Sequence, residues 1–297
     1  SAEEVHIEEA YITFTALPGG FSARAGQWLT FVGRHNREHP HVFSYLDHPL
    51  LVREYLGGEG WSSVGAQLST LLDVGSVPLT LTAEVLDRGP GAAGHAHGHE
   101  EESHEEEHED SSSGAPGRTL GDLAYNGRAS MFLTLGESTW LDFGASAGTG
   151  IYDEDENLRQ VWYGADAKFK WAPNQYTSLT VVAEFLGNAY DVIELEPGIL
   201  AVASGPATSR PFGFFANVDY RFNRKWNVGA LVDYAQEIED PEHDQLGVGA
   251  FGGFSLFEES TLIRLLARRD YVPEEKDPFS VQLQVVFSLG PHKPHQF

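Results

Sequence analysis

A two-residue apolar repeat between Gln160 and Gly187 constrains the fold of this chain more than any other feature. In QVWYGADAKFKWAP, apolar side chains occupy every second position from Val161 to Trp171, and polar or small residues mostly fall between them. YTSLTVVAEFLG repeats the pattern after a tight connection at residues 173–175. A period of two indicates β-strands, and two strands of about ten residues joined tightly form a β-hairpin with one apolar face.

The same unit recurs along the chain. Strands are expected at about 11–16, 23–31, 64–72, 79–85, 129–135, 141–147, 161–171, 179–185, 212–220, 226–232, 246–256, 263–268 and 279–287. The connections alternate between short and long, which is typical of a transmembrane β-barrel with tight turns on one side and long loops on the other. A soluble β-sandwich is the competing fold, but its loops are of mixed length at both ends.

The sequence therefore predicts an all-β fold, an antiparallel transmembrane β-barrel formed by residues 1–297 as a single domain. About thirteen strands are visible. The first strand would start on the long-loop side, so we expect at least one further strand upstream, giving fourteen in the complete protein, with sixteen as the alternative. The chain contains no apolar run of transmembrane-helix length, which does not count against a barrel because barrel strands alternate in polarity.

Composition fits the envelope of a Gram-negative bacterium. The chain has no cysteine and a net charge of -25, so nucleic acid is not expected as a partner because its phosphates would be repelled. Lipid, lipopolysaccharide and small cations are the expected partners, with a homo-oligomer or an envelope protein as further candidates. Aromatic residues near the short turns, such as Trp171, Tyr176 and Trp226, suit a membrane interface.

The residues between the outward apolar positions carry charges of both signs, which a water-filled lumen would solvate. We expect these side chains to line a pore. They are Arg24, Glu84, Asp142, Asp166, Lys168, Lys170, Glu184, Asp219, Arg221, Asp233, Arg264 and Arg268.

Two histidine clusters are candidate metal sites, because imidazole suits zinc and related divalent transition metals. The acidic segment 88–127 contains His95, His97, His99, His104 and His108, and is expected to be an extracellular, disordered loop that binds metal loosely. The alternative is a solvated acidic loop without metal. Segment 35–61 contains the second cluster, which consists of His35, His39, His41, Asp47 and His48.

The second cluster differs because apolar residues are interleaved with its histidines, so segment 35–61 is expected to fold inward as a constriction loop. Its histidines could hold a metal, or simply anchor the loop to the barrel wall. No catalytic motif is evident, since the chain contains neither a Gly-x-Ser-x-Gly elbow nor a His-Glu-x-x-His helix. The chain is therefore not expected to be an enzyme.

Residues 7–72 also resemble a known family. Leu17-Pro18-Gly19, Asn36 with His39-Pro40-His41, and the segment 47–52 follow one another as in zinc-regulated, TonB-independent bacterial outer-membrane porin-like proteins, and the ending GPHKPHQF is similar too. The resemblance implies a barrel linked to zinc. The predicted function is thus a passive outer-membrane channel that captures zinc or another divalent metal, and the alternative is a non-transporting surface barrel with a plugged lumen.

Overall fold

In the computed structural model the chain is an antiparallel β-sheet of 14 strands with little helix. The structure describes residues 9–39, 42–75, 77–90, 119–153, 158–194, 204–238, 243–256, 261–273 and 278–287. The strands are β1 (Ala10–Leu17), β2 (Phe21–Leu29), β3 (Ser62–Val74), β4 (Val77–Leu86), β5 (Ala124–Gly136), β6 (Thr139–Asp153), β7 (Leu158–Asn174), β8 (Thr177–Glu194), β9 (Ser204–Ser209), β10 (Phe212–Arg221), β11 (Trp226–Gln236), β12 (Asp244–Ser255), β13 (Thr261–Tyr271) and β14 (Phe279–Phe287). The predicted all-β antiparallel class is confirmed.

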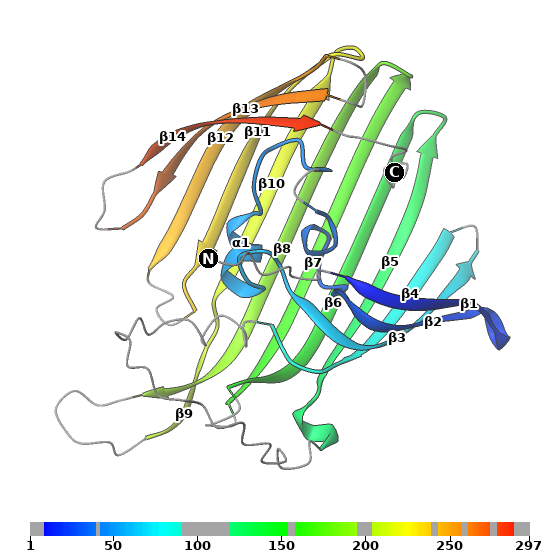
Figure 1. Ribbon diagram of the computed structural model, residues 1–297, viewed down its shortest axis with the longest axis vertical. Helices are drawn as coiled ribbons and strands as arrows, with labels where there is room; N and C mark the ends of the chain where they lie inside the picture. The colour runs from blue at the N-terminus through cyan, green and yellow to red at the C-terminus, as the bar shows by residue number, and fades with distance from the viewer. Residues whose placement is uncertain are drawn as a thin grey trace, which may run out of the picture.

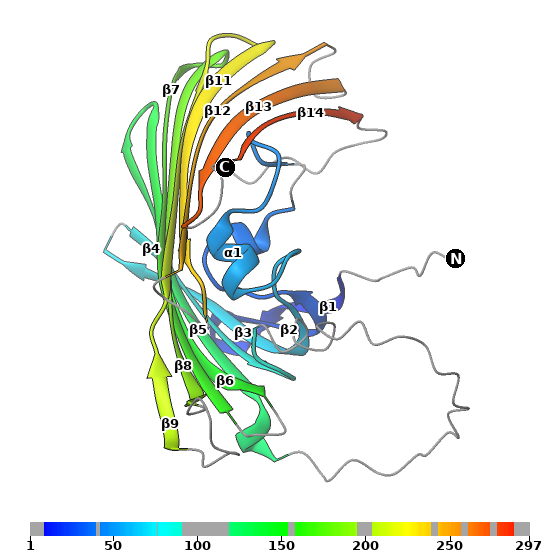
Figure 2. The same ribbon diagram turned by 90° about the vertical axis from the view of Figure 1, so that its left-hand side faces the viewer.

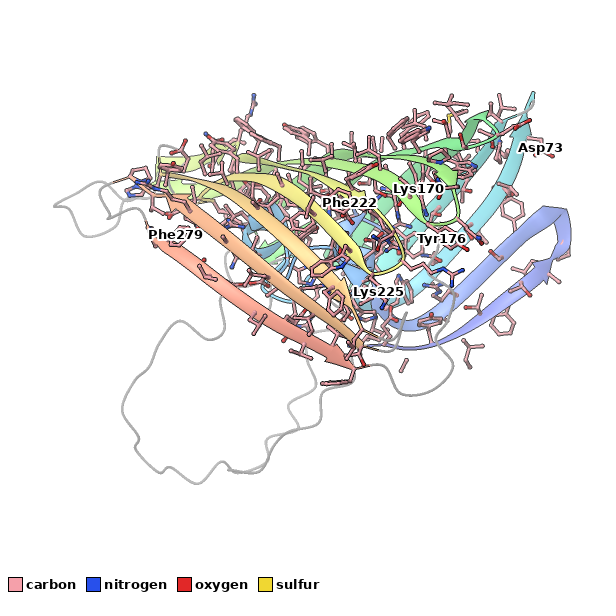
Figure 3. All side chains as sticks on the ribbon, turned by 90° about the horizontal axis from the view of Figure 1, so that it is seen from above. Asp73, Lys170, Tyr176, Phe222, Lys225 and Phe279 are labelled. Carbon is pink, nitrogen blue, oxygen red and sulfur yellow. The ribbon has the colours of Figure 1, made fainter. Side chains whose placement is uncertain are left out.

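Strands adjacent in sequence are also adjacent in the sheet, with one exception. β8 pairs with both β9 and β10, and β9 lies off the path that runs from β1 to β14. The sheet curves strongly, and Figure 3 shows it from above as a trough with one open side. Among the described residues, β1 and β14 form the two free edges of this trough. The described part of the sheet is therefore open and not a closed barrel.

The alternation in the sequence separates the two faces of the sheet. On β7, Val161 and Tyr163 are 47% and 46% exposed, whereas the intervening Trp162 is fully buried. On β14, Val281 and Leu283 are exposed on the same outward face. The convex face is thus covered by exposed apolar side chains, and the concave face carries polar and charged side chains together with buried apolar ones such as Trp162.

The short turns after β5, β7 and β10 lie side by side at the top of Figure 1. Asn174 and Asn223 each build their turn with a side-chain oxygen that accepts hydrogen bonds from backbone N–H groups two and three residues further on. Gly19 has a φ of 79° inside a 3-10 turn, η1 (Pro18–Gly20), a conformation that favours glycine. These local signals explain why the hairpins could be predicted.

The concave face is covered in part by the connection between β2 and β3. We call its described residues, 30–39 and 42–61, the inner segment. It contains a 3-10 turn, η2 (His35–Arg37), and a short helix, α1 (Leu50–Tyr55). Figure 2 shows α1 inside the curve of the sheet. No described helix has the length and apolar character needed to cross a membrane.

Apolar packing holds the inner segment against the concave side of the sheet, whose strands are called the wall from here on. Leu51, Val52 and Tyr55 of α1 are fully buried, in one cluster with Phe215 and Leu231 of the sheet. The sequence predicted no helix here, because six residues are too few to show a helical period. The helix is stabilised by its burial against β10 and β11, and not by the helix propensity of its own residues.

Candidate functional site

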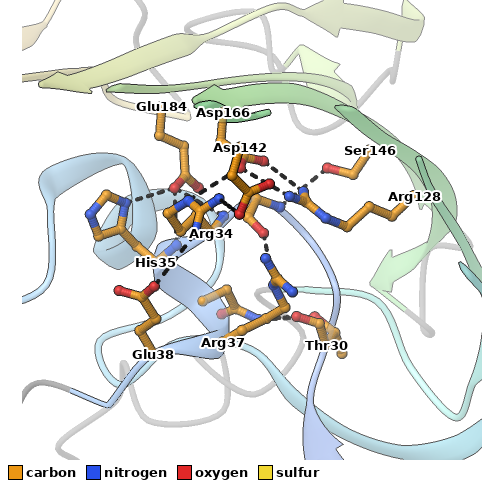
Figure 4. Close-up of polar contacts among 12 residues, drawn as sticks. Thr30, Arg34, His35, Arg37, Glu38, Arg128, Asp142, Ser146, Asp166 and Glu184 are labelled. Atoms are coloured by element: carbon orange, nitrogen blue, oxygen red, sulfur yellow. Dashed lines mark hydrogen bonds and ion pairs between the residues drawn. The ribbon is translucent and has the colours of Figure 1, made fainter. Parts of the chain in front are cut away.

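The centre of the candidate site is Glu184, a carboxylate on β8 that the inner segment covers (Figure 4). Its Oε2 accepts hydrogen bonds from the backbone N–H groups of Arg34 and His35, both at 3.0 Å, and lies 2.6 Å from His35 Nδ1. The Glu184 side chain is fully buried. A buried carboxylate needs such compensation, so these three contacts fix the inner segment at this point.

A second ionic contact lies beside the first. Arg34 of the inner segment binds Asp142 of β6 at 2.5 Å through Nη2, and its Nε lies 3.5 Å from Asp166 of β7. Asp166 is held on its other side by both terminal nitrogens of Arg128. Burial alone would lower the pKa of Arg34, but the charge and hydrogen bond of Asp142, followed by the charge of Asp166, raise it above its ordinary value. Arg34 therefore stays charged in this contact.

Burial has a different result at Arg37. Desolvation, followed by repulsion from Arg128 and Arg34, lowers the pKa of its guanidinium to about 10. Its Nε donates to the Gly33 carbonyl at 3.2 Å. The three arginines are thus close enough to influence one another, and the carboxylates of the wall offset their repulsion.

Glu84 of β4 forms another anchor. It is almost fully buried and accepts hydrogen bonds from the Phe31 N–H at 3.0 Å and from the side chains of Trp28, Gln67 and Asn126 at 2.7, 3.0 and 2.7 Å. The carboxylate thus joins four strands to the start of the inner segment.

Two aspartates hold the far part of the inner segment. Asp233 of β11 accepts from the Leu50 N–H at the start of α1, at 3.0 and 2.9 Å, and from Arg268 at 3.0 Å. Asp219 of β10 accepts from the Ser44 hydroxyl at 2.6 Å. The inner segment is therefore fixed to the wall from β4 to β11.

Asn36 closes the inner segment on itself. Its amide nitrogen donates to the carbonyls of Thr30 and Trp61, at 2.9 and 3.0 Å, and its Oδ1 accepts from the Trp61 N–H at 2.6 Å. These bonds join the two ends of the segment. Asn36 was part of the motif that suggested a family resemblance, but its role could not be read from that motif.

The side chains predicted to line a pore stand on the concave face, but they differ in their surroundings. Glu84, Asp166, Glu184, Asp233 and Arg264 are buried. The expectation that water solvates all these charges is wrong for this set, because the inner segment and neighbouring side chains replace water as their partners. Lys168, Lys170, Arg221 and Asp142 instead line a pocket of about 510 Å³ on the same face.

Two other predicted lining residues are bound to neighbours. The Arg24 guanidinium lies over the Tyr11 ring, 4.2 Å from its centroid. Arg268 Nε donates to Asp270 Oδ1 at 2.7 Å, in addition to its bond to Asp233. Whether any of these residues lines a conducting pore stays a prediction.

The predicted metal ligands are not brought together where the structure describes them. His35 pairs with Glu184, His39 Nε2 lies 3.9 Å from Glu9, and Asp47 accepts from the His48 backbone N–H at 2.9 Å. Within the described ranges no three His, Asp or Glu side chains form a group that could hold a metal. The described members of the cluster around His35 thus form no three-ligand group, and a metal site that includes His41 stays a prediction.

The remaining predicted ligands lie outside the described residues. They are His41, His95, His97, His99, His104 and His108.

The sequence reasoning missed Gly33, Arg34, Asn36 and Ser44. Arg34 and Ser44 have no periodic signal, because they lie in a connection without regular structure. Gly33 has a φ of 60°, and a Cβ there would collide with the Glu184 carboxylate. The only available signal was general: buried carboxylates spaced along the inward faces of the strands require partners, and the long connection was the nearest source.

Comparison with known proteins adds little about function. No family model matches the chain. The chain is similar to an uncharacterized protein of Aquifex aeolicus (strain VF5), with 29% identity over 237 residues, which covers 78% of this chain and 48% of the relative. The chain thus spans about half the length of the relative that it matches.

Proposed function

We propose that this chain forms a transmembrane β-barrel of the bacterial outer membrane and acts as a channel for small solutes. The observation that carries the proposal is the outward face, where apolar side chains such as Val161, Val228 and Leu283 are exposed on strand after strand. A protein in water rarely exposes a continuous apolar surface of this size, whereas a barrel in lipid requires one.

The free edges of β1 and β14 bear on the architecture of this proposed barrel. An unpaired edge is costly inside a membrane, because its backbone N–H and C=O groups have no water to bind. Because β9 lies off it, the path from β1 to β14 contains thirteen strands, so one or three further strands between its two edges would pair both and give fourteen or sixteen. Both numbers are even, as in single-chain bacterial barrels.

The inner segment would narrow the lumen of such a barrel. It lies across the concave face, and ionic contacts at Glu184, Asp142 and Asp233 hold it in place. The second candidate function, a non-transporting barrel with a plugged lumen, is favoured by the same contacts. The two functions differ in whether solutes pass the seated segment.

Conductance in a planar lipid bilayer tests the proposal. We expect the wild-type protein to give small, ion-conducting steps, and Glu184→Gln to give larger or more frequent ones because it loosens the inner segment. Glu137→Gln, in the exposed turn between β5 and β6, removes the same charge elsewhere and should conduct like the wild type. A complete absence of conductance in all three proteins would support the plugged barrel.

The metal part of the proposal rests on the sequence. The stretch GHAHGHEEESHEEEHED offers many imidazole and carboxylate ligands, and we propose that it captures zinc or another divalent metal loosely. Calorimetric zinc titration of the wild type and of a variant lacking residues 95–110 tests this. Equal affinity in the two proteins would remove the stretch from the metal site.

A further inference from the structure

A pocket on the concave face, close to the short turns, differs from the rest of this acidic protein. It has a volume of about 510 Å³, and its lining includes Phe132, Trp140, Tyr176, Lys168, Lys170 and Arg221. Figure 3 shows Lys170 and Tyr176 near each other at this end of the sheet. Its volume lies within the range of small-molecule sites.

The charge of the pocket is opposite to that of the whole chain. The chain has a net charge of -25, yet the pocket lining contains three cations and a single carboxylate, Asp142. Asp142 is already engaged by Arg34 at 2.5 Å. The pocket therefore keeps an excess of positive charge.

The charge of Lys170 is disfavoured by the other two cations, whereas Lys168 also lies near the carboxylates of Glu38 and Asp142. Lys168 and Arg221 both repel the Lys170 ammonium, which is itself partly withdrawn from water. The strand register holds them together, since Lys168 and Lys170 point to the same face of β7 and Arg221 pairs with Ser178 on the neighbouring β8. A bound anion would relieve this repulsion, and the low local dielectric would strengthen the attraction.

The rest of the lining selects the body of the ligand. Phe132, Trp140 and Tyr176 provide aromatic surface, and Asn174, Gln175 and Ser178 provide hydrogen-bonding groups. An inorganic ion would leave the aromatic surface uncovered. A flat apolar group that carries one acidic group uses both parts of the pocket.

We propose that this pocket binds small organic anions in which a carboxylate is attached to a flat, apolar body. None of the lining residues belongs to the stretch 95–110 that is proposed to capture metal, and the existence of the pocket does not depend on whether the barrel conducts. The ammonium and guanidinium groups bind the carboxylate, and the aromatic side chains pack against the ring. Binding weakens as salt concentration rises, because part of the affinity is ionic.

Equilibrium dialysis of radiolabelled benzoate against the full chain in a non-ionic detergent tests the site. We expect the wild-type protein to bind benzoate, and to bind the neutral analogue benzamide at least about tenfold more weakly, a difference of about 1.4 kcal/mol. Lys170→Gln combined with Arg221→Gln should weaken benzoate binding about tenfold or more and leave benzamide binding unchanged. Lys225→Gln, in the adjacent exposed turn, removes a charge outside the pocket and should bind like the wild type.

One further measurement and one further variant keep the outcome clear. Circular dichroism reports whether the double variant keeps its β-structure, and Lys170→Gln alone serves if it does not. The proposal is overturned if wild-type protein binds no benzoate, if benzamide binds equally well, or if Lys225→Gln weakens benzoate binding as much as the pocket variants do.

Discussion

Glu184 shows at the scale of one residue how this fold positions its inner segment. A carboxylate on the inward face of a strand would ordinarily be placed in water, but here the backbone of Arg34 and the ring of His35 cover it. Because the partners of Glu184 Oε2 belong to the inner segment, while β8 is held by its backbone pairing with β7 and β10, its substitution affects the segment more than the strand. The residue therefore offers a direct way to loosen one part of the molecule.

Glu184→Gln should release the inner segment more often. The amide keeps an acceptor oxygen but loses the charge, and breaking a buried ionic contact costs about 3 kcal/mol. That loss raises the population of the released segment about a hundredfold. Trypsin cleavage after Arg34 or Arg37 measures this population, and Glu137→Gln is the control. Equal cleavage rates in the two variants would mean that Glu184 does not hold the segment.

His48 predicts a pH dependence for the same segment. Burial, followed by repulsion from His35, Arg53 and His39, lowers the pKa of its imidazole despite the nearby Asp47. A histidine whose pKa is lowered in the folded state stays neutral there, while the released segment binds a proton below about pH 6.5. The contribution of neutral His48 to the stability of the seated inner segment is therefore complete above about pH 6.5 and decreases as pH falls below it.

A nitroxide attached at Gly58→Cys reports the motion of the inner segment, since the natural chain has no cysteine and a side chain at Gly58 would meet open space. We expect the label to become more mobile from pH 7.5 to pH 5.5. His48→Gln should remove much of that change. The same pH response in both proteins would assign it to groups other than His48.

At the scale of elements, the strands and short turns could be predicted, while the contents of the long connections could not. Strand β7 follows a strict period of two, and Asn174 marks its turn. Helix α1 has only six residues, and its formation depends on burial against strands distant in sequence. Strand β9 is likewise defined by its pairing with β8, which no local pattern indicates.

The candidate site was predictable on one side only. The inward position of Glu184 and Asp233 follows from the alternation, because each lies between outward apolar neighbours. Their partners, the Arg34 and Leu50 backbone N–H groups, depend on the path of an irregular connection. A pattern in sequence can thus locate buried charge in a strand, but not the group that neutralises it.

Gly33→Ala tests how closely the connection approaches the wall. Gly33 has a φ of 60°, and a methyl group there would overlap the Glu184 carboxylate. We expect the inner segment to shift and trypsin cleavage at Arg37 to increase about tenfold or more, since strain and lost contacts cost roughly 1–3 kcal/mol. Gly58→Ala, which meets nothing within 4 Å, should be cleaved like the wild type. Similar cleavage of the two variants would contradict the close approach.

For the whole molecule, the central question is whether the exposed convex face of the sheet contacts lipid or water. If this face contacts lipid, a charge there should be costly. Leu265, 50% exposed near the middle of β13, is a suitable position. Leu265→Arg should reduce stability in lipid vesicles by about 2–4 kcal/mol, measured from equilibrium folding monitored by tryptophan fluorescence. Glu137→Arg, in a short turn, should cost much less, and equal costs would speak against a lipid-facing wall.

The most direct test of the membrane proposal compares the two faces of one strand. Single cysteines at positions 179, 180, 181, 183 and 185 of β8 can each carry a nitroxide, because the chain has no other cysteine. Power-saturation measurements in lipid vesicles then give the accessibility of each label to oxygen, which is enriched in lipid, and to a nickel complex, which is enriched in water. We predict high oxygen accessibility at Leu179, Val181, Ala183 and Phe185, and low oxygen accessibility at the inward-facing Thr180. Nickel accessibility as high as oxygen accessibility at Val181 and Phe185 would contradict a transmembrane barrel.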